Sequence, residues 1–315
     1  MKINVKQCAD MLKEQDNILV LCHAHPDGDT LGSGFALCSA LLRLGKKARI
    51  LCADEIPSKY FEIFEKPETV DFEEEFVVSV DVATPNLLGD ICEKYEKSID
   101  LCIDHHNSNS QYAKYLLLDG NAAAACETVL EVIKALGVSI DKAIADYLFT
   151  GITTDTGCFK YASTTEKTFR AAAELVECGA DNGKINRVMF ETKTKAYAAM
   201  ERLAIDSMQF FCQDRVCVIS VTQEMYEKTG ATEQDTEAIP PLTRQVEGVE
   251  IGLTIKEKSN GECKCSIRTY ESVDAAKLAA LFGGGGHKQA AACRFECSVE
   301  EAKKQLIARC EELLK

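Results

Sequence analysis

The sequence predicts an α/β protein with an N-terminal parallel-sheet domain that has helices on both faces, a helical linker and a smaller C-terminal α+β domain. Three observations support this prediction. The 315 residues are enough for two domains. Short apolar runs alternate with helical periodicity through the first half of the chain, which is typical of βαβ units. The last third offers strands with little helix between them and ends in one helical stretch.

In the N-terminal domain, residues 1–190, strands and helices are expected to alternate. The strands are expected at residues 18–22, 48–52, 76–80, 99–103 and 115–118, because these are short apolar runs of the kind found in buried parallel strands. The helices are expected at residues 30–45, 126–136 and 142–150.

The pattern turns helical after residue 163, and a long helix is expected over residues 185–208. Residues 191–210 are interpreted as a helical linker. The C-terminal domain, residues 211–315, is expected to contain strands at 216–221, 251–255 and 263–268, a glycine run and a helix at 299–314.

Composition excludes several classes of protein. Hydrophobic residues make up 46% of the chain and charged residues 27%, as in ordinary globular proteins. No apolar run is long enough to span a membrane, and acidic residues stand where a signal peptide would be apolar, so a cytoplasmic protein without a membrane partner is expected. The 16 cysteines form no C-x-x-C pair and lie mostly in apolar runs, so free thiols are expected.

The formal net charge of -14 argues against long duplex nucleic acid as a partner. An acidic surface lacks the cations that such a partner needs to neutralise its phosphates. A short anionic ligand could still be held by bound metal ions and a few basic side chains.

The five histidines fall in three short clusters. The first, His23 to Asp29, and the second, Asp104 to His106, each follow an expected strand directly. Asp81 also ends an expected strand, and Asp155 lies in an expected turn after a helix. Open parallel sheets bind ligands at the carboxyl ends of their strands, so these segments are expected to meet in one crevice. The third cluster ends the glycine run, Gly283 to His287.

A crevice with so many carboxylates implies bound cations, because the carboxylates would otherwise repel and desolvate one another. Mixed carboxylate and imidazole ligands without thiolate suit Mn²⁺, Mg²⁺, Fe²⁺ or Co²⁺. The number of ligands suits two ions about 3.5 to 4 Å apart, a pair that can clamp an in-line attack on phosphorus. The carboxylates concerned are Asp27, Asp29, Asp81, Asp104 and Asp155.

At these residues the chain resembles the DHH phosphoesterase superfamily. The superfamily's first motif, His-x-x-Pro-Asp-x-Asp-x-x-Gly-Ser, appears from His23 to Ser33, and its name-giving Asp-His-His motif begins at Asp104. Asp81 and Asp155 match the second and fourth motifs. The frequent C-terminal partner domain ends in Gly-Gly-Gly-His-x-x-Ala-Ala-Gly, which is matched from Gly284 onward except that the final glycine is displaced. Within the superfamily, a chain of this size without extra domains resembles the nanoRNase and 3′-phosphoadenosine 5′-phosphate (pAp) phosphatase type.

The resemblance implies a role for each residue of the crevice. His23 and Asp27 would hold one ion and Asp81 would bridge the two, with a hydroxide between the ions as nucleophile. Asp29, His105 and Asp155 would hold the second ion. The expected catalytic residues are His106, which would contact the scissile phosphate, and Asp104, which would orient the neighbouring imidazole.

The glycine run suggests a phosphate-binding loop, because backbone amides without Cβ atoms in the way can approach a phosphate closely. Arg268, at the end of an expected strand, is placed to donate two parallel hydrogen bonds to a second phosphate. The expected substrate-binding residues are Arg268, Gly284, Gly285, Gly286 and His287.

The resemblance therefore implies a phosphoesterase that depends on two divalent ions, Mn²⁺ in preference to Mg²⁺, Co²⁺ or Fe²⁺. Its substrates would be short oligoribonucleotides, pAp or both. A phosphodiesterase for cyclic or linear dinucleotides, such as cyclic di-AMP or pApA, is the nearest alternative. A non-catalytic nucleotide sensor is the alternative of another class, and a homodimer is left open.

Overall fold

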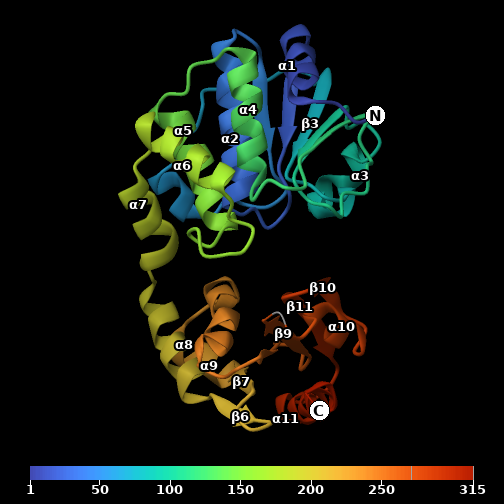
Figure 1. Cartoon of the computed structure of the whole chain (residues 1–315), viewed down its shortest axis with the longest axis vertical. Helices are drawn as coiled ribbons and strands as arrows, with labels where there is room; N and C mark the ends of the chain where they lie inside the picture. Colours follow the sequence, from blue (N-terminus) through green and yellow to red (C-terminus); the bar gives the residue numbers. More distant parts are fainter. Residues whose placement is uncertain (271, 315) are drawn as a thin grey trace. The chain divides into compact units, whose positions relative to one another are not determined.

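The structure is a computed structural model that describes residues 1–270 and 272–314, with all their side chains except those of Gln234 and His287 (Figure 1). The chain divides into two compact units, Met1–Thr192 and Lys193–Lys315. Among the described residues, no helix has the length and apolar character needed to cross a membrane.

The first unit is built on a parallel sheet of five strands in the order β2-β1-β3-β4-β5, so the predicted α/β class is confirmed. The strands are β1 (Ile18–Leu21), β2 (Ala48–Leu51), β3 (Phe76–Val80), β4 (Leu101–Asp104) and β5 (Tyr115–Leu118). The helical segments are α1 (Val5–Glu14), α2 (Gly28–Arg43), η1 (Ser58–Glu62), η2 (Pro85–Ile91), α3 (Cys92–Tyr95), α4 (Ala125–Leu136), α5 (Lys142–Asp155), α6 (Glu166–Glu177), α7 (Asn182–Asn186) and η3 (Arg187–Glu191).

Strands β1, β3 and β4 are buried on both faces, which is why they lie in continuous apolar runs of the sequence. On one face, Ile18 and Val20 of β1 pack in a core with α1, α2, α4 and α5. On the other face, Leu19 and Leu21 pack with residues of η2 and α3. Alternate residues of a strand point to opposite faces, so one short strand supplies both cores.

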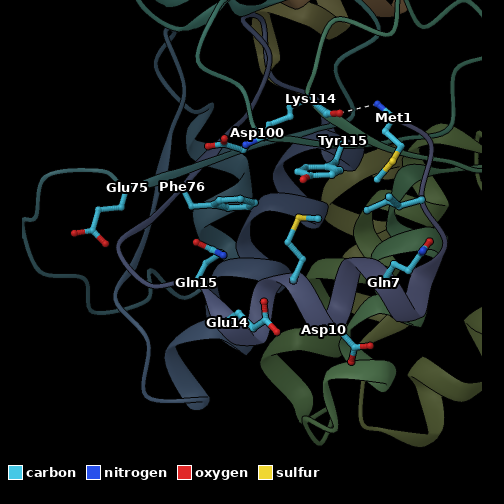
Figure 2. A pocket seen from close by; sticks show the side chains of 12 residues that line it. Met1, Gln7, Asp10, Glu14, Gln15, Glu75, Phe76, Asp100, Lys114 and Tyr115 are labelled. Carbon is cyan, nitrogen blue, oxygen red and sulfur yellow. Dashed lines mark hydrogen bonds between the residues drawn. The ribbon is translucent and has the colours of Figure 1, made fainter.

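The N-terminal segment extends the sheet beyond β5. The amide of Ile3 donates to the carbonyl of Leu116, and the amide of Leu116 donates to the carbonyl of Met1. A hollow of about 590 Å³ opens beside this edge, and Figure 2 shows the ammonium of Met1 donating to the carbonyl of Lys114 at its rim. The hollow is lined by α1 and by the first residues of β3 and β5, and its lining contains none of the predicted site residues.

The second unit contains a mixed sheet of six strands in the order β10-β11-β9-β8-β7-β6. Helix α11 and helix α10 share a core with one face of this sheet, and α8 packs on Ile219 and Val221 of β7. The strands are β6 (Gln209–Phe211), β7 (Val216–Val221), β8 (Ile251–Glu257), β9 (Cys263–Thr269), β10 (Gly285–His287) and β11 (Ala290–Phe295). The helical segments are α8 (Lys195–Asp206), α9 (Gln223–Thr229), η4 (Gln234–Ala238), η5 (Pro240–Gln245), α10 (Ala275–Ala280) and α11 (Val299–Leu313).

Two helix predictions were wrong. The single helix expected over residues 185–208 is two helical stretches separated by residues 192–194, because Thr194 begins α8 as an N-cap and its side chain accepts from the amide of Tyr197. Helix α5 continues to Asp155, although a helix was expected only over residues 142–150 and Asp155 was expected in a turn after it. Gly151 is needed inside the helix, since a Cβ atom there would lie 2.2 Å from Sγ of Cys126.

Close contact between α2 and α5 depends on a second glycine. A Cβ atom at Gly32 would lie 2.4 Å from the backbone oxygen of Tyr147, which cannot move without moving α5. The two helices therefore approach nearer than alanine would allow. Their approach brings the start of α2 beside the end of α5, the two places from which Asp29 and Asp155 extend.

Gly32→Ala is expected to destabilise the first unit by about 1 to 3 kcal/mol, because the added methyl group overpacks the contact with α5. Urea unfolding followed by circular dichroism measures this change. The matched control is Gly183→Ala in α7, where a Cβ atom would lie 3.8 Å from its nearest neighbour, Oδ1 of Asp181. Alanine there should leave stability unchanged or raise it slightly. Equal midpoints for wild type and Gly32→Ala would contradict the packing argument.

Candidate metal centre

The predicted crevice residues come together at the carboxyl ends of β1, β3 and β4. Asp81 directly follows β3, Asp104 is the last residue of β4, and His23 lies two residues after β1. Three sets of donor atoms each lie within 4.8 Å of one another: His23 with Asp27 and Asp81, Asp29 with His105 and Asp155, and Asp81 with His105 and His106.

The first set places one imidazole between two carboxylates. Nε2 of His23 lies 3.6 Å from Oδ1 of Asp27 and 3.6 Å from Oδ2 of Asp81. Nδ1 of His23 lies 2.8 Å from the backbone oxygen of Ala24, which can only accept a hydrogen bond, so we infer that Nδ1 carries the proton. Nε2 then faces the carboxylates, and once deprotonated it has the arrangement of an imidazole that ligates a metal.

His105 has the same arrangement in the second set. Its Nδ1 lies 3.1 Å from the backbone oxygen of Ala122, and its Nε2 lies 3.5 Å from Oδ2 of Asp155 and 3.7 Å from Oδ2 of Asp29. Nε2 of His105 also lies 3.4 Å from Oδ1 of Asp81. Asp81 therefore contacts an imidazole of each set.

Two of the carboxylates also cap helices. Oδ1 of Asp27 accepts from the amides of Asp29 and Thr30 at the start of α2. The buried carboxylate of Asp29 accepts from the amides of Ala125 and Cys126, at 2.6 and 2.9 Å, at the start of α4. Helix N-termini attract negative charge, so these hydrogen bonds hold the two side chains in place.

Asp81 is the least compensated member of the cluster. Its side chain is buried, and within the described part of the chain its Oδ1 has no hydrogen-bond partner. Its φ of 58° lies in the left-handed region, which costs energy in a residue other than glycine. A divalent ion would give this buried oxygen a partner, and the surrounding carboxylate and imidazole donors suit Mn²⁺, Mg²⁺, Fe²⁺ or Co²⁺.

Without a cation, the cluster takes up protons. Burial raises the pKa of Asp155 to about 7, against the opposing effect of His105. Burial also raises the pKa of Asp29 well above its usual range, and the charge of Asp81 adds to this effect. Burial lowers the pKa of His23, but its contacts with the two neighbouring carboxylates outweigh burial and raise it to about 11. These shifts show an excess of negative charge that bound cations would neutralise.

The predicted phosphate-binding loop of the second unit is a strand rather than a loop. Residues Gly285–His287 form β10 and pair with β11, in the register Gly285 with Ala292 and His287 with Ala290. A Cβ atom at Gly284 would lie 2.2 Å from the backbone oxygen of Ala292, so the neighbouring strand requires glycine there.

The other predicted substrate-binding residues lie on the same sheet. Arg268 in β9 pairs with Ala290, which in turn pairs with His287, so the backbones of Arg268 and His287 share one row across three strands. Nη1 of Arg268 donates to the backbone oxygen of Ile267. The side chain of His287 lies outside the described part of the structure.

Comparison with known proteins identifies the family of the chain. A model of the DHH family's N-terminal domain matches residues 17–152, and a model of the DHHA1 domain matches residues 213–315. The chain belongs to the DHH family.

Two curated relatives in this family are named bifunctional oligoribonuclease and PAP phosphatase NrnA. The protein from Thermus thermophilus is 32% identical, covering 90% of this chain and 86% of its own length. The protein from Bacillus subtilis is 24% identical, covering 86% of this chain and 87% of its own length.

Two solved structures share the fold. An exopolyphosphatase-related protein from Bacteroides fragilis superposes with a TM-score of 0.91 at 22% identity, covering 98% of this chain and 97% of the other. RecJ in complex with Mn²⁺ from Thermus thermophilus has a TM-score of 0.56 at 15% identity, covering 98% of this chain and 54% of RecJ. At these identities the likeness is one of fold.

In this DHH protein, the first residue of the Asp-His-His motif positions the third. The carboxylate of Asp104 is fully buried, and its Oδ1 lies 2.8 Å from Nδ1 of His106. Its Oδ2 accepts from Nδ2 of Asn109 at 2.6 Å. Burial raises the pKa of Asp104, but the hydrogen bonds from His106 and Asn109 outweigh burial and lower it below its usual value. The ionised carboxylate of Asp104 therefore holds the His106 ring at Nδ1, and Nε2 is the remaining polar atom of that ring.

Asn109 was missed by the sequence analysis. It is buried, and besides Asp104 it contacts the backbone oxygen of Val82 at 3.3 Å. Its own Oδ1 accepts from the amide of Gln111 at 2.7 Å. A buried amide that satisfies a buried carboxylate fixes that carboxylate's orientation. The position of Asn109 five residues after Asp104, in a run of polar residues, gave no signal of this role.

Asn109→Ala is expected to lower kcat/KM roughly ten- to a hundred-fold through the loosened Asp104 and His106, with little loss of bound metal. Turnover of bis-p-nitrophenyl phosphate and metal content by elemental analysis measure the two effects. Ser108→Ala, at an exposed position on the same loop, is the control and should retain activity. Unchanged turnover of Asn109→Ala would contradict the positioning role.

Proposed function

We propose that this protein is a divalent-metal-dependent phosphoesterase that hydrolyses short oligoribonucleotides and pAp. The observation that carries the proposal is the buried carboxylate of Asp81, which lies 3.6 Å from Nε2 of His23 in one donor set and 3.4 Å from Nε2 of His105 in the other. Both NrnA relatives are named for these two activities, and each is matched over more than four-fifths of its length.

The proposed metal site divides the cluster into two halves. His23 and Asp27 would hold one ion, and Asp29, His105 and Asp155 would hold the other, with Asp81 bridging them. Divalent ions in such a site lower the pKa of bound water and neutralise charge on a phosphoryl group. The ion that we propose is Mn²⁺, because imidazole and carboxylate together suit an ion of intermediate hardness.

The chain's own residues orient the reacting phosphate. His106, held at Nδ1 by Asp104, would donate from Nε2 to a non-bridging phosphate oxygen. Because Asp104 stays ionised, it favours a protonated His106, and the hydrogen bond to Asp104 raises the pKa of His106. A cationic donor stabilises the negative charge that develops on phosphorus-bound oxygens.

Arg268 would contact a second phosphate of the substrate. It lies partly exposed at the end of β9, in the same backbone row as His287. Substrates with a scissile phosphate and another one, such as pAp and a short RNA, could use both contacts. A cytoplasmic location and a homodimer stay predictions.

A chromatographic time course with Mn²⁺ tests the function. The substrates are pAp, the five-nucleotide RNA pentaadenylate, pApA and cyclic di-AMP. We expect hydrolysis of pAp and pentaadenylate, and loss of all activity in EDTA. Preferred hydrolysis of cyclic di-AMP would favour the dinucleotide phosphodiesterase. Binding of nucleotides without hydrolysis of any would favour the sensor, and full activity in EDTA would refute metal dependence.

Asp81→Asn is expected to abolish turnover and to lower the bound metal, since one carboxylate is proposed to serve both ions. Asparagine keeps the shape and tolerates the left-handed backbone, so the change tests charge rather than fold. His106→Ala should keep near-normal metal content while losing most turnover. Elemental analysis of both purified variants, next to turnover, measures the difference, and an equal metal loss in the two variants would refute the division of roles.

Arg268→Ala is expected to lower kcat/KM for pAp and pentaadenylate by about ten-fold, the effect of losing one partly exposed charge-assisted contact to phosphate. Hydrolysis of bis-p-nitrophenyl phosphate, which has no second phosphate, should change little. Arg268→Lys keeps the charge without the fork, so an intermediate loss is expected. An equal fall on all substrates would place Arg268 in the catalytic centre or the fold instead.

A further inference from the structure

A row of three cations crosses the sheet of the second unit. In the register of β8, β9 and β11, Lys256 pairs with Lys264, and Lys264 pairs with Arg294. Directly opposed residues in antiparallel strands point to the same face of a sheet, so the three side chains share one face. Like charges directly opposite one another destabilise a strand pair.

Among the described side chains, no opposite charge contacts Lys264 or Arg294. Both side chains are exposed, and within residues 1–270 and 272–314 neither makes an ion pair or a side-chain hydrogen bond. Lys256 is different, because its ammonium donates to the backbone oxygen and the hydroxyl of Thr236. Burial, with the charge of Lys264 adding to its effect, lowers the pKa of Lys256 to about 8. The positive charge of Lys264 therefore acts on Lys256 across the strand pair.

Lys264 and Arg294 line a hollow of about 410 Å³ that has no carboxylate in its lining. The backbone of Gly283 and Gly284 and the ring of Phe282 form another part of its wall. A second hollow, of about 330 Å³, is also lined by Lys264 and Arg294, together with Glu262 and Lys258. The second hollow contains the carboxylate of Glu262, and its Lys258 is already paired with Glu233. The first hollow has no carboxylate among its described lining residues and is therefore the one suited to an anion.

Lys264 and Arg294 lie on the same face of the sheet as Arg268. Residues four apart in a strand point to the same side, so Lys264 and Arg268 both extend from that face of β9. At about 3.3 Å per residue the two positions are roughly 13 Å apart along the strand. Only small side chains, those of Ala290 and Ala292, line the face between them on β11. The two phosphates of a single nucleotide such as pAp lie closer together than this span, whereas phosphates two or more nucleotides apart in an oligonucleotide can match it.

We propose that Lys264 and Arg294 bind a phosphate of the oligonucleotide chain, at least one nucleotide away from the phosphate at Arg268. The pair then selects for oligonucleotides of several residues over pAp. This inference rests on the proposed function for its substrate class, while the binding of a phosphate chain to the second unit can be measured without hydrolysis.

The test compares Lys264→Ala/Arg294→Ala with the wild type on pAp and pentaadenylate. We expect kcat/KM for pentaadenylate to fall roughly five- to thirty-fold, the loss of two exposed cationic contacts, and kcat/KM for pAp to stay unchanged. The matched control is Lys304→Ala/Arg309→Ala on α11, which removes the same charge from exposed positions and should affect neither substrate. Lys264→Arg/Arg294→Lys keeps both charges and should keep the wild-type preference.

A binding measurement separates this inference from the proposed function. The Kd of fluorescein-labelled pentaadenylate is measured by anisotropy in EDTA at several salt concentrations. Loss of one phosphate contact should lower the slope of log Kd against log salt by about 0.7. An equal slope and Kd in wild type and double variant, or an equal fall in kcat/KM on both substrates, would overturn the inference. If the wild type hydrolyses neither substrate but the slope differs as expected, the proposed function fails and the phosphate contact stands.

Discussion

The excess of carboxylates over cations at the strand ends is the constraint on which the first unit depends. The fold compensates some of them by its own means: the start of α2 holds Asp27, the start of α4 holds Asp29, and His106 with Asn109 holds Asp104. No such partner serves Oδ1 of Asp81 among the described residues. Asp155 stands at the last residue of α5, where the helix dipole opposes a negative charge. The uncompensated charge is thus concentrated at the two positions where divalent ions would be most strongly held.

The glycines of α2 and α5 are what allow these charges to meet. Gly28 approaches Thr154 and Gly32 approaches Tyr147, so the two helices run past each other in opposite directions. The start of one helix therefore lies beside the end of the other. A Cβ atom at Gly151 would lie 2.9 Å from Oδ1 of Asp29, so the same close approach also forms the wall of the site. The packing of the two helices and the meeting of Asp29 with Asp155 are consequences of one contact.

The sequence predicts the strands of the first sheet well, because buried parallel strands are short apolar runs and because their carboxyl ends carry the charged motif residues. Residues 76–80 and 115–118 form β3 and β5 with the predicted bounds. Features that depend on tertiary contacts could not be predicted from the sequence. Gly151 has the appearance of a turn residue but is required by Cys126, and the role of Asn109 arises only when the chain folds back over Asp104. The restart of the helix at Thr194 did carry a local capping signal, which periodicity alone overlooked.

The glycine run shows how a correct motif can have more than one physical cause. Gly284 would clash with the backbone of β11 if it carried a Cβ atom, and Gly286 has a φ of 144° that favours glycine. Both are required by the pairing of β10 with β11, whatever ligand the unit binds, so their identity as glycines does not itself indicate a phosphate. The case for a phosphate depends instead on the cations. Arg268, Lys264 and Arg294 extend from one face of the sheet, and along that face only small side chains separate them. Lys264 and Arg294 are exposed and make no ion pair among the described residues, and such a pair of cations in a protein of net charge -14 is the feature that most directly indicates an anionic chain as ligand.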